Sequence, residues 1–119
     1  MGKIGGFKEF NRADEGNIAV VERVANYNEF TIALPKDKIK EQGSRCMDCG
    51  IPFCHSSCPL GNLIPDFNDM VHQEEWQSAL EILQSTNNFP EFTGRLCPAP
   101  CEKSCVLGII KEPVAIENI

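Results

Sequence analysis

Seven cysteines in two short groups constrain this chain more than any other feature. The first group lies in CMDCGIPFCHSSCP (residues 46–59) and the second in LCPAPCEKSC (residues 96–105). An odd number of cysteines fits poorly with a framework made only of disulfides. The chain starts without the apolar stretch of a secretory signal, so we expect a cytoplasmic protein, in which structural disulfides are rare. The thiols are therefore candidates for binding metal.

The spacing of the first group favours iron–sulfur clusters over zinc. The pattern is C-x2-C-x4-C-x3-C-P, formed by Cys46, Cys49, Cys54 and Cys58. Structural zinc sites close a tetrahedron around one ion, usually with two separated pairs of ligands. A run of four cysteines ending in Cys-Pro is typical of bacterial ferredoxins, although their second spacing is x2 rather than x4. A zinc-stabilised module that docks a partner subunit is the alternative interpretation.

The second group contains Cys97, Cys101 and Cys105 in the pattern C-x3-C-x3-C. Two cubane clusters with four cysteine ligands each would need one cysteine more than the chain has. Either one iron has a ligand other than cysteine, or one cluster is incomplete. Because Pro59 turns Cys58 away from its neighbours, we expect Cys58 to serve the second cluster, as the last cysteine of a ferredoxin run does. The first cluster then needs a ligand from the second group.

A short helix is predicted directly before the first cysteine group. Pro35 is suited to a helix start, the residues KDKIKEQ follow, and Gly43 is expected to end the helix. The helix end would present Arg45 and Cys46. Residues 1–34 have weaker patterns, and we interpret them as an N-terminal arm and docking segment, followed by a cluster-binding domain at residues 35–119.

The region between the cysteine groups is predicted to form two helices. Residues 62–86 carry two apolar stripes on nearly opposite faces, which one straight helix could not bury together. We therefore expect a break near residues 72–75, with Pro65 in the first turn of the earlier helix. Asn87, Asn88 and Pro90 are expected to end the later helix. No strand or hairpin pattern is present, so the predicted fold class is all-α with irregular cysteine-rich loops.

The distribution of charge excludes two classes of partner. The net charge is −6, and residues 46–119 carry three basic and ten acidic side chains. An acidic domain is unsuited to binding nucleic acid or an anionic membrane surface, because both attract basic patches. Arg45 and Arg95 each lie just before a cysteine group. These two arginines either offset the charge of a cluster or lie in solvent.

Three segments carry a resemblance to a known family. They read GKIGGFKEFNR, SRCMDCGIPFCHSSCPLGNLIPDFND and GRLCPAPCEKSCVLGIIKEPVAIENI, at residues 2–12, 44–69 and 94–119. Together they resemble the N-terminal iron–sulfur domain of the glutamate synthase small (β) subunit, which is related to the N-terminal domain of dihydropyrimidine dehydrogenase. The resemblance implies an α-helical ferredoxin-like fold with two 4Fe–4S clusters.

The resemblance also implies a role and a ligand set. In that family, electrons pass from NADPH to FAD and through the clusters to the large subunit, which makes glutamate. The FAD and NADPH sites lie in other domains of the parent flavoprotein subunit, and this fragment lacks their G-x-G-x-x-G loop. The matching positions assign the first cluster to Cys46, Cys49, Cys54 and Cys105. They assign the second cluster to Cys58, Cys97 and Cys101, with a fourth ligand expected beyond Ile119.

Overall fold

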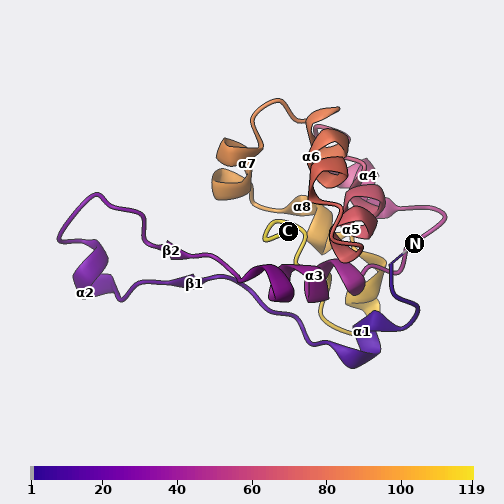
Figure 1. The fold of residues 1–119 in the computed structure, drawn as a ribbon, viewed down its shortest axis with the longest axis horizontal. Coiled ribbons are helices and arrows are strands. Elements are labelled where there is room, and N and C mark those ends of the chain that lie inside the picture. Colours follow the sequence, from indigo (N-terminus) through magenta and orange to yellow (C-terminus); the bar gives the residue numbers. More distant parts are fainter. Residues whose placement is uncertain (1) are drawn as a thin grey trace.

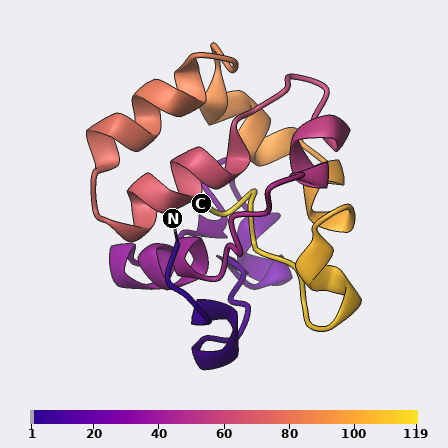
Figure 2. The same ribbon diagram turned by 90° about the vertical axis from the view of Figure 1, so that its right-hand side faces the viewer.

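Three helices form the body of the protein. The computed structural model describes residues 2–119. Helix α5 (Ile64–His72) packs against both α3 (Lys36–Ser44) and α6 (Trp76–Gln84). Figure 2 shows these three helices one above another. The described chain is mostly helical, with only two short strands, so the predicted all-α class is confirmed.

Shorter elements surround this body and carry the cysteines. They are α1 (Gly6–Glu9), α2 (Val20–Arg23), α4 (Phe53–Ser57), α7 (Pro90–Leu96), α8 (Pro100–Lys103) and the 3-10 helix η1 (Val106–Ile109). Helices α4 and α8 contact each other although they lie far apart in the sequence. The two cysteine-bearing parts of the chain therefore meet.

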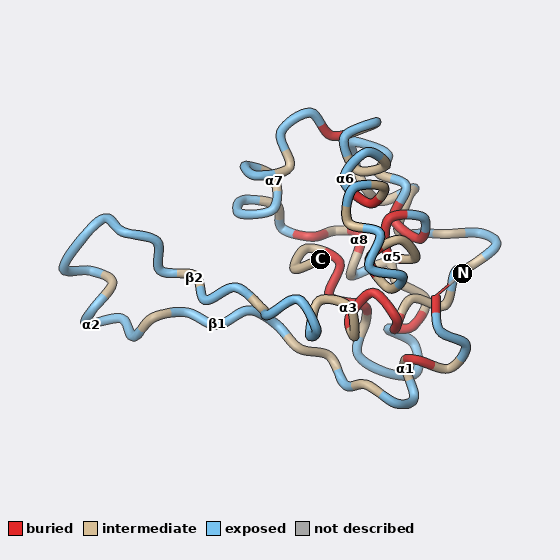
Figure 3. Tube along the Cα trace, in the orientation of Figure 1, coloured by how far each residue is buried: buried red, intermediate tan, exposed pale blue. Residues whose placement is uncertain are grey.

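A narrow hairpin projects from the body (Figure 1). Strand β1 (Gly16–Asn17) pairs antiparallel with β2 (Thr31–Ile32), and α2 lies between them. The expectation that the chain has no strand or hairpin was wrong. With two residues in each strand, there is too little sequence for an alternating pattern to show. Figure 3 shows that the hairpin segment, residues 16–32, is almost entirely exposed.

The break between the two central helices is confirmed, and its backbone cause is visible. Helix α5 has its proline in the first turn and ends at His72, and α6 begins at Trp76. Between them, Glu74 has a φ of 65°, in the left-handed region that ends helices. The chain turns there, so both helices place their apolar stripes on the same core.

Two predicted helix ends were wrong. Gly43 lies inside α3, which continues to Ser44. Gly43 is also a point where α3 lies close against α5. A Cβ atom on Gly43 would lie 2.9 Å from the backbone oxygen of Asn68. Pro90 begins α7 instead of ending α6, since proline fits the first turn of a helix as well as the end of one.

The core is built around the second cysteine group and the end of the described chain. Its buried members are Ile64, Phe67, Cys101, Leu107, Val114 and Ile116. Figure 1 shows the C-terminal residues running through the middle of the molecule rather than along its edge. The fold therefore buries the segment that follows the cysteines against the helices that precede them.

Candidate metal centre

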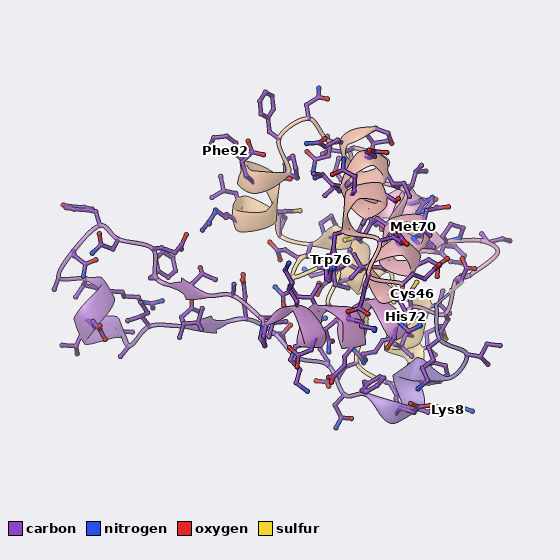
Figure 4. All side chains as sticks on the ribbon, viewed as in Figure 1. Lys8, Cys46, Met70, His72, Trp76 and Phe92 are labelled. Atoms are coloured by element: carbon purple, nitrogen blue, oxygen red, sulfur yellow. The ribbon has the colours of Figure 1, made fainter. Side chains whose placement is uncertain are left out.

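Four cysteines from three separate parts of the chain line one cavity. They are Cys46, Cys49, Cys54 and Cys105. Cys46 follows the end of α3, Cys54 lies in α4, and Cys105 lies between α8 and η1. Figure 4 marks Cys46 close to α3 and α5. We call this space the four-cysteine cavity.

The remaining three cysteines line a second and larger cavity, of about 690 Å³. Cys58 follows α4, Cys97 follows α7, and Cys101 lies within α8. Most of the wall is apolar and comes from α5, α6 and α7, while Ile116–Ile119 close one side. We call this space the three-cysteine cavity.

Neighbouring cysteines of one short helix face different cavities. Cys54 lies in α4 and Cys58 directly follows it, yet Cys54 lines the four-cysteine cavity and Cys58 the three-cysteine cavity. Helix α8 holds the arrangement from the other side, because a hydrogen bond joins the hydroxyls of Ser57 and Ser104. The two cysteine groups of the sequence are thus interleaved in space.

The two cavities share a wall. Ile64 and Ile116 line both of them, and these side chains are only 1% and 8% exposed. The cavities are therefore separated at this point by hydrocarbon side chains.

Burial keeps several thiols protonated in the absence of metal. It raises the pKa of Cys46 and Cys49, that of Cys54 to about 11 and that of Cys101 to about 12. Smaller increases come from thiols of the same cavity, for example from Cys105 acting on Cys49. Metal that binds here has to displace protons, so its binding is linked to pH.

The donor set of the four-cysteine cavity fits an iron–sulfur cluster. Cysteine thiolates are the ligands of such clusters, and four thiols converge on one enclosed space. Within residues 2–119, no three His, Cys, Asp or Glu side chains lie close enough to hold a single metal ion. The three-cysteine cavity fits a cluster through Cys58, Cys97 and Cys101, which leave a further ligand to be supplied from elsewhere.

The two arginines that precede the cysteine groups have different surroundings. Arg45 is 1% exposed and donates hydrogen bonds to the backbone oxygens of Glu112, at 2.8 Å, and Pro113, at 2.9 Å. Burial lowers the pKa of Arg45, but a guanidinium remains charged at neutral pH. Arg95 is exposed and forms an ion pair with Glu29 of the hairpin segment.

Sequence reasoning missed several residues at these cavities. Asn68 is fully buried and lines the four-cysteine cavity. Its side-chain amide acts to lower the pKa of Cys46, against the larger effect of burial. Neither amide atom of Asn68 has a hydrogen-bond partner among residues 2–119 within the accepted distance and angle. Asn118 lines the three-cysteine cavity. Asn68 is an unremarkable polar residue of a helix in the sequence, and only the packing of α3 on α5 buries it.

The comparison with protein families identifies the kind of domain. Residues 23–119 match the family described as "Dihydropyrimidine dehydrogenase domain II, 4Fe-4S cluster". The matched range includes all seven cysteines. The chain belongs to this family of iron–sulfur domains. The family resemblance carried by the cysteine segments is thereby confirmed.

Glutamate synthases are among the relatives of this iron–sulfur domain. It is 56% identical over 97 residues to the glutamate synthase (NADPH) small chain of Mycobacterium tuberculosis, which covers 82% of this chain and 20% of the relative. It is 47% identical over 128 residues to the glutamate synthase (NADPH) small chain of Bacillus subtilis, and the match covers 100% of this chain and 26% of the relative. It is 50% identical over 119 residues to the glutamate synthase (NADH) of Saccharomyces cerevisiae, covering 98% and 6%. The chain spans about a quarter or less of these relatives.

Within residues 2–119, no helix combines the length and the apolar character that crossing a bilayer requires.

Proposed function

We propose that this iron–sulfur domain carries electrons for a glutamate synthase. Electrons would enter from NADPH and FAD, bound in other domains of the parent subunit. They would leave to the large subunit that makes glutamate. The main support is that the seven cysteines line two adjoining cavities. Two redox sites on either side of a shared wall could pass electrons from one to the other. The glutamate synthase relatives support the choice of enzyme.

Each cavity is proposed to hold one 4Fe–4S cluster, which supplies one-electron redox chemistry when bound. Cys46, Cys49, Cys54 and Cys105 bind cluster one. Cys58, Cys97 and Cys101 bind cluster two, and residues that follow Ile119 in the parent subunit supply its fourth ligand. This assignment is supported by the cavity that each thiol lines.

The other residues of the cavities control the surroundings of the clusters. Ile64 and Ile116 keep water out of the space between the two sites. Exclusion of water and the charge around a cluster both affect its reduction potential. The protein therefore contributes ligands, spacing and a dry environment, while the electrons come from outside the domain.

The hairpin segment is proposed to contact the large subunit. Val21 is 85% exposed, Val24 is 74% exposed and Tyr27 is fully exposed, all on the part of the chain that projects from the body (Figure 1). Apolar side chains gathered on an exposed projection are typical of a surface that is covered by a partner.

Single cysteine substitutions test the ligand assignment. Cys105→Ser and Cys49→Ser should damage one and the same cluster, although these residues are far apart in the sequence. Cys58→Ser and Cys97→Ser should damage the other one. The measurement is low-temperature EPR of the reduced, anaerobically reconstituted protein, and Ser56→Ala, within the same cysteine run, should leave both signals intact.

Two outcomes would contradict the proposal. If Cys58→Ser and Cys49→Ser abolish one signal together while the other remains, each cysteine group of the sequence holds its own metal. If the unmodified protein binds zinc and takes up no electrons, the domain is not a redox conduit. In the complete enzyme, the cysteine variants should lose glutamate formation but retain NADPH oxidation by an artificial acceptor.

A further inference from the structure

A buried arginine that forms no ion pair among residues 2–119 directly precedes a cysteine of the four-cysteine cavity. Arg45 precedes Cys46 in the chain and is 1% exposed. Its hydrogen-bond acceptors are neutral: the backbone oxygens of Glu112 and Pro113, and the side-chain oxygen of Gln42 at 3.5 Å. Its Nε atom has no partner. None of the ion pairs among residues 2–119 includes Arg45.

Arg12, which lies near Arg45, shows how carboxylates can compensate the charge of an arginine in this protein. Arg12 also reaches the backbone oxygen of Pro113, at 3.4 Å. Unlike Arg45, it forms ion pairs with Asp14, at 2.6 Å, and Glu102, at 2.7 Å. The charge of Arg12 is therefore compensated by carboxylates in direct contact, whereas no described carboxylate lies within ion-pair distance of Arg45.

A buried and uncompensated charge is costly, so proteins pair such charges or place them beside an ion of opposite sign. Neutral oxygens accept hydrogen bonds from Nη1 and Nη2 of Arg45, but they carry no charge that could balance that of the guanidinium. Burial and the nearby Arg12 lower the pKa of Arg45, while the Glu112 carboxylate, the Cys105 sulfur of the four-cysteine cavity and Asp14 act in the opposite direction. A cluster held by four thiolates carries net negative charge, and it becomes more negative when it accepts an electron. A cluster in the cavity that Cys46 and Cys105 line would therefore add negative charge near Arg45, which forms no ion pair among the described residues.

We propose that Arg45 is a positioning residue that raises the reduction potential of cluster one by stabilising its reduced form. The proposal rests on the proposed binding of a cluster by the four-cysteine cavity. Net charge near an iron–sulfur cluster is one of the factors that set its potential. Because the guanidinium is held on two carbonyl groups and shielded from solvent, its charge is fixed in place and screened little by salt.

The three-cysteine cavity has no equivalent feature among the described residues. The charged residue in its wall is Glu117, which is acidic. Arg95, which precedes that cysteine group, is exposed and paired with Glu29. The effect of Arg45 should therefore be selective for cluster one, which distinguishes it from a general change in the stability of the protein.

Redox titration monitored by EPR tests this role. In Arg45→Gln, the reduction equilibrium of cluster one should weaken about tenfold, which corresponds to a fall in midpoint potential of about 59 mV for one electron. Arg45→Lys keeps the charge and should retain most of the potential. The matched control is Arg95→Gln, which removes the exposed arginine before the other cysteine group and should leave both midpoints unchanged. The signal lost in Cys105→Ser identifies cluster one.

The outcomes separate electrostatic from structural roles. Loss of cluster one in Arg45→Gln but not in Arg45→Lys would support a need for the charge. An unchanged midpoint in Arg45→Gln, an equal fall in both variants, or loss of cluster one from both would overturn the proposal and leave Arg45 as a clamp on residues 112–113. Absence of a cluster-one signal from the unmodified protein would instead refute the proposed function.

Discussion

Replacing Gly43 with alanine tests the close approach of α3 and α5, which sets the position of Cys46. The added Cβ would lie 2.9 Å from the backbone oxygen of Asn68 and 3.4 Å from the backbone nitrogen of His72. Ordinary contacts between non-bonded heavy atoms begin near 3.5 Å. Because the obstructing oxygen belongs to the backbone of α5, the two helices would have to move apart by about 0.6 Å.

Two effects of opposite sign determine the result for Gly43→Ala. Overpacking of this kind costs about 1–3 kcal/mol. Alanine in place of glycine inside a helix recovers about 1 kcal/mol. We therefore expect a net loss of up to about 2 kcal/mol. In a domain of this size, each kcal/mol lowers the melting temperature by about 4 °C.

The assay is thermal unfolding followed by far-UV circular dichroism, at equal cluster content. The matched control is Gly94→Ala in α7, where a Cβ would meet nothing within 4 Å. That variant should be more stable than the unmodified protein by about 0.5–1 kcal/mol. If Gly43→Ala raises the melting temperature as Gly94→Ala does, the contact between α3 and α5 is looser than the structure indicates.

Two further predictions concern folding and docking. Hydrogen exchange of residues 46–58 should slow markedly when the clusters are loaded, because metal binding is linked to folding in small domains. Helices α5 and α6 should be protected from exchange with and without the clusters. Equal protection of residues 46–58 in the loaded and the metal-free protein would contradict this. The double substitution Val21→Ser and Tyr27→Ser should weaken binding to the large subunit at least tenfold in a pull-down titration and leave the iron content unchanged. A loss of iron with binding intact would show instead that the hairpin segment supports the clusters.

Local sequence patterns predicted the helices that the rest of the fold depends on. The two apolar stripes of residues 62–86 required two helices, and the structure has them. Proline and glycine were less informative, because each fits more than one position. Pro90 starts a helix that it was expected to terminate. Gly43 is needed for a contact with α5 rather than for a turn.

The contrast between the two arginines could not be predicted from the sequence. Arg45 and Arg95 both stand just before a cysteine group, in similar local sequence. Their difference arises because the backbone of residues 112–113, far along the chain, lies against Arg45 and accepts its hydrogen bonds. No local pattern contains that information. The burial of Asn68 depends in the same way on the approach of a distant helix.

The wall shared by the two cavities has a consequence for the rate of electron transfer. Ile64 and Ile116 contribute branched hydrocarbon side chains, without hydroxyl, amide or charge, between the two sites. Dipoles that reorient when a charge moves impose a reorganisation energy, and an alkyl wall contributes little of it. Tunnelling also weakens steeply with distance, and both cavities are lined by the same two residues, Ile64 and Ile116. If each cavity holds a cluster as proposed, the same apolar contacts that stabilise the core would let an electron pass with little rearrangement of its surroundings.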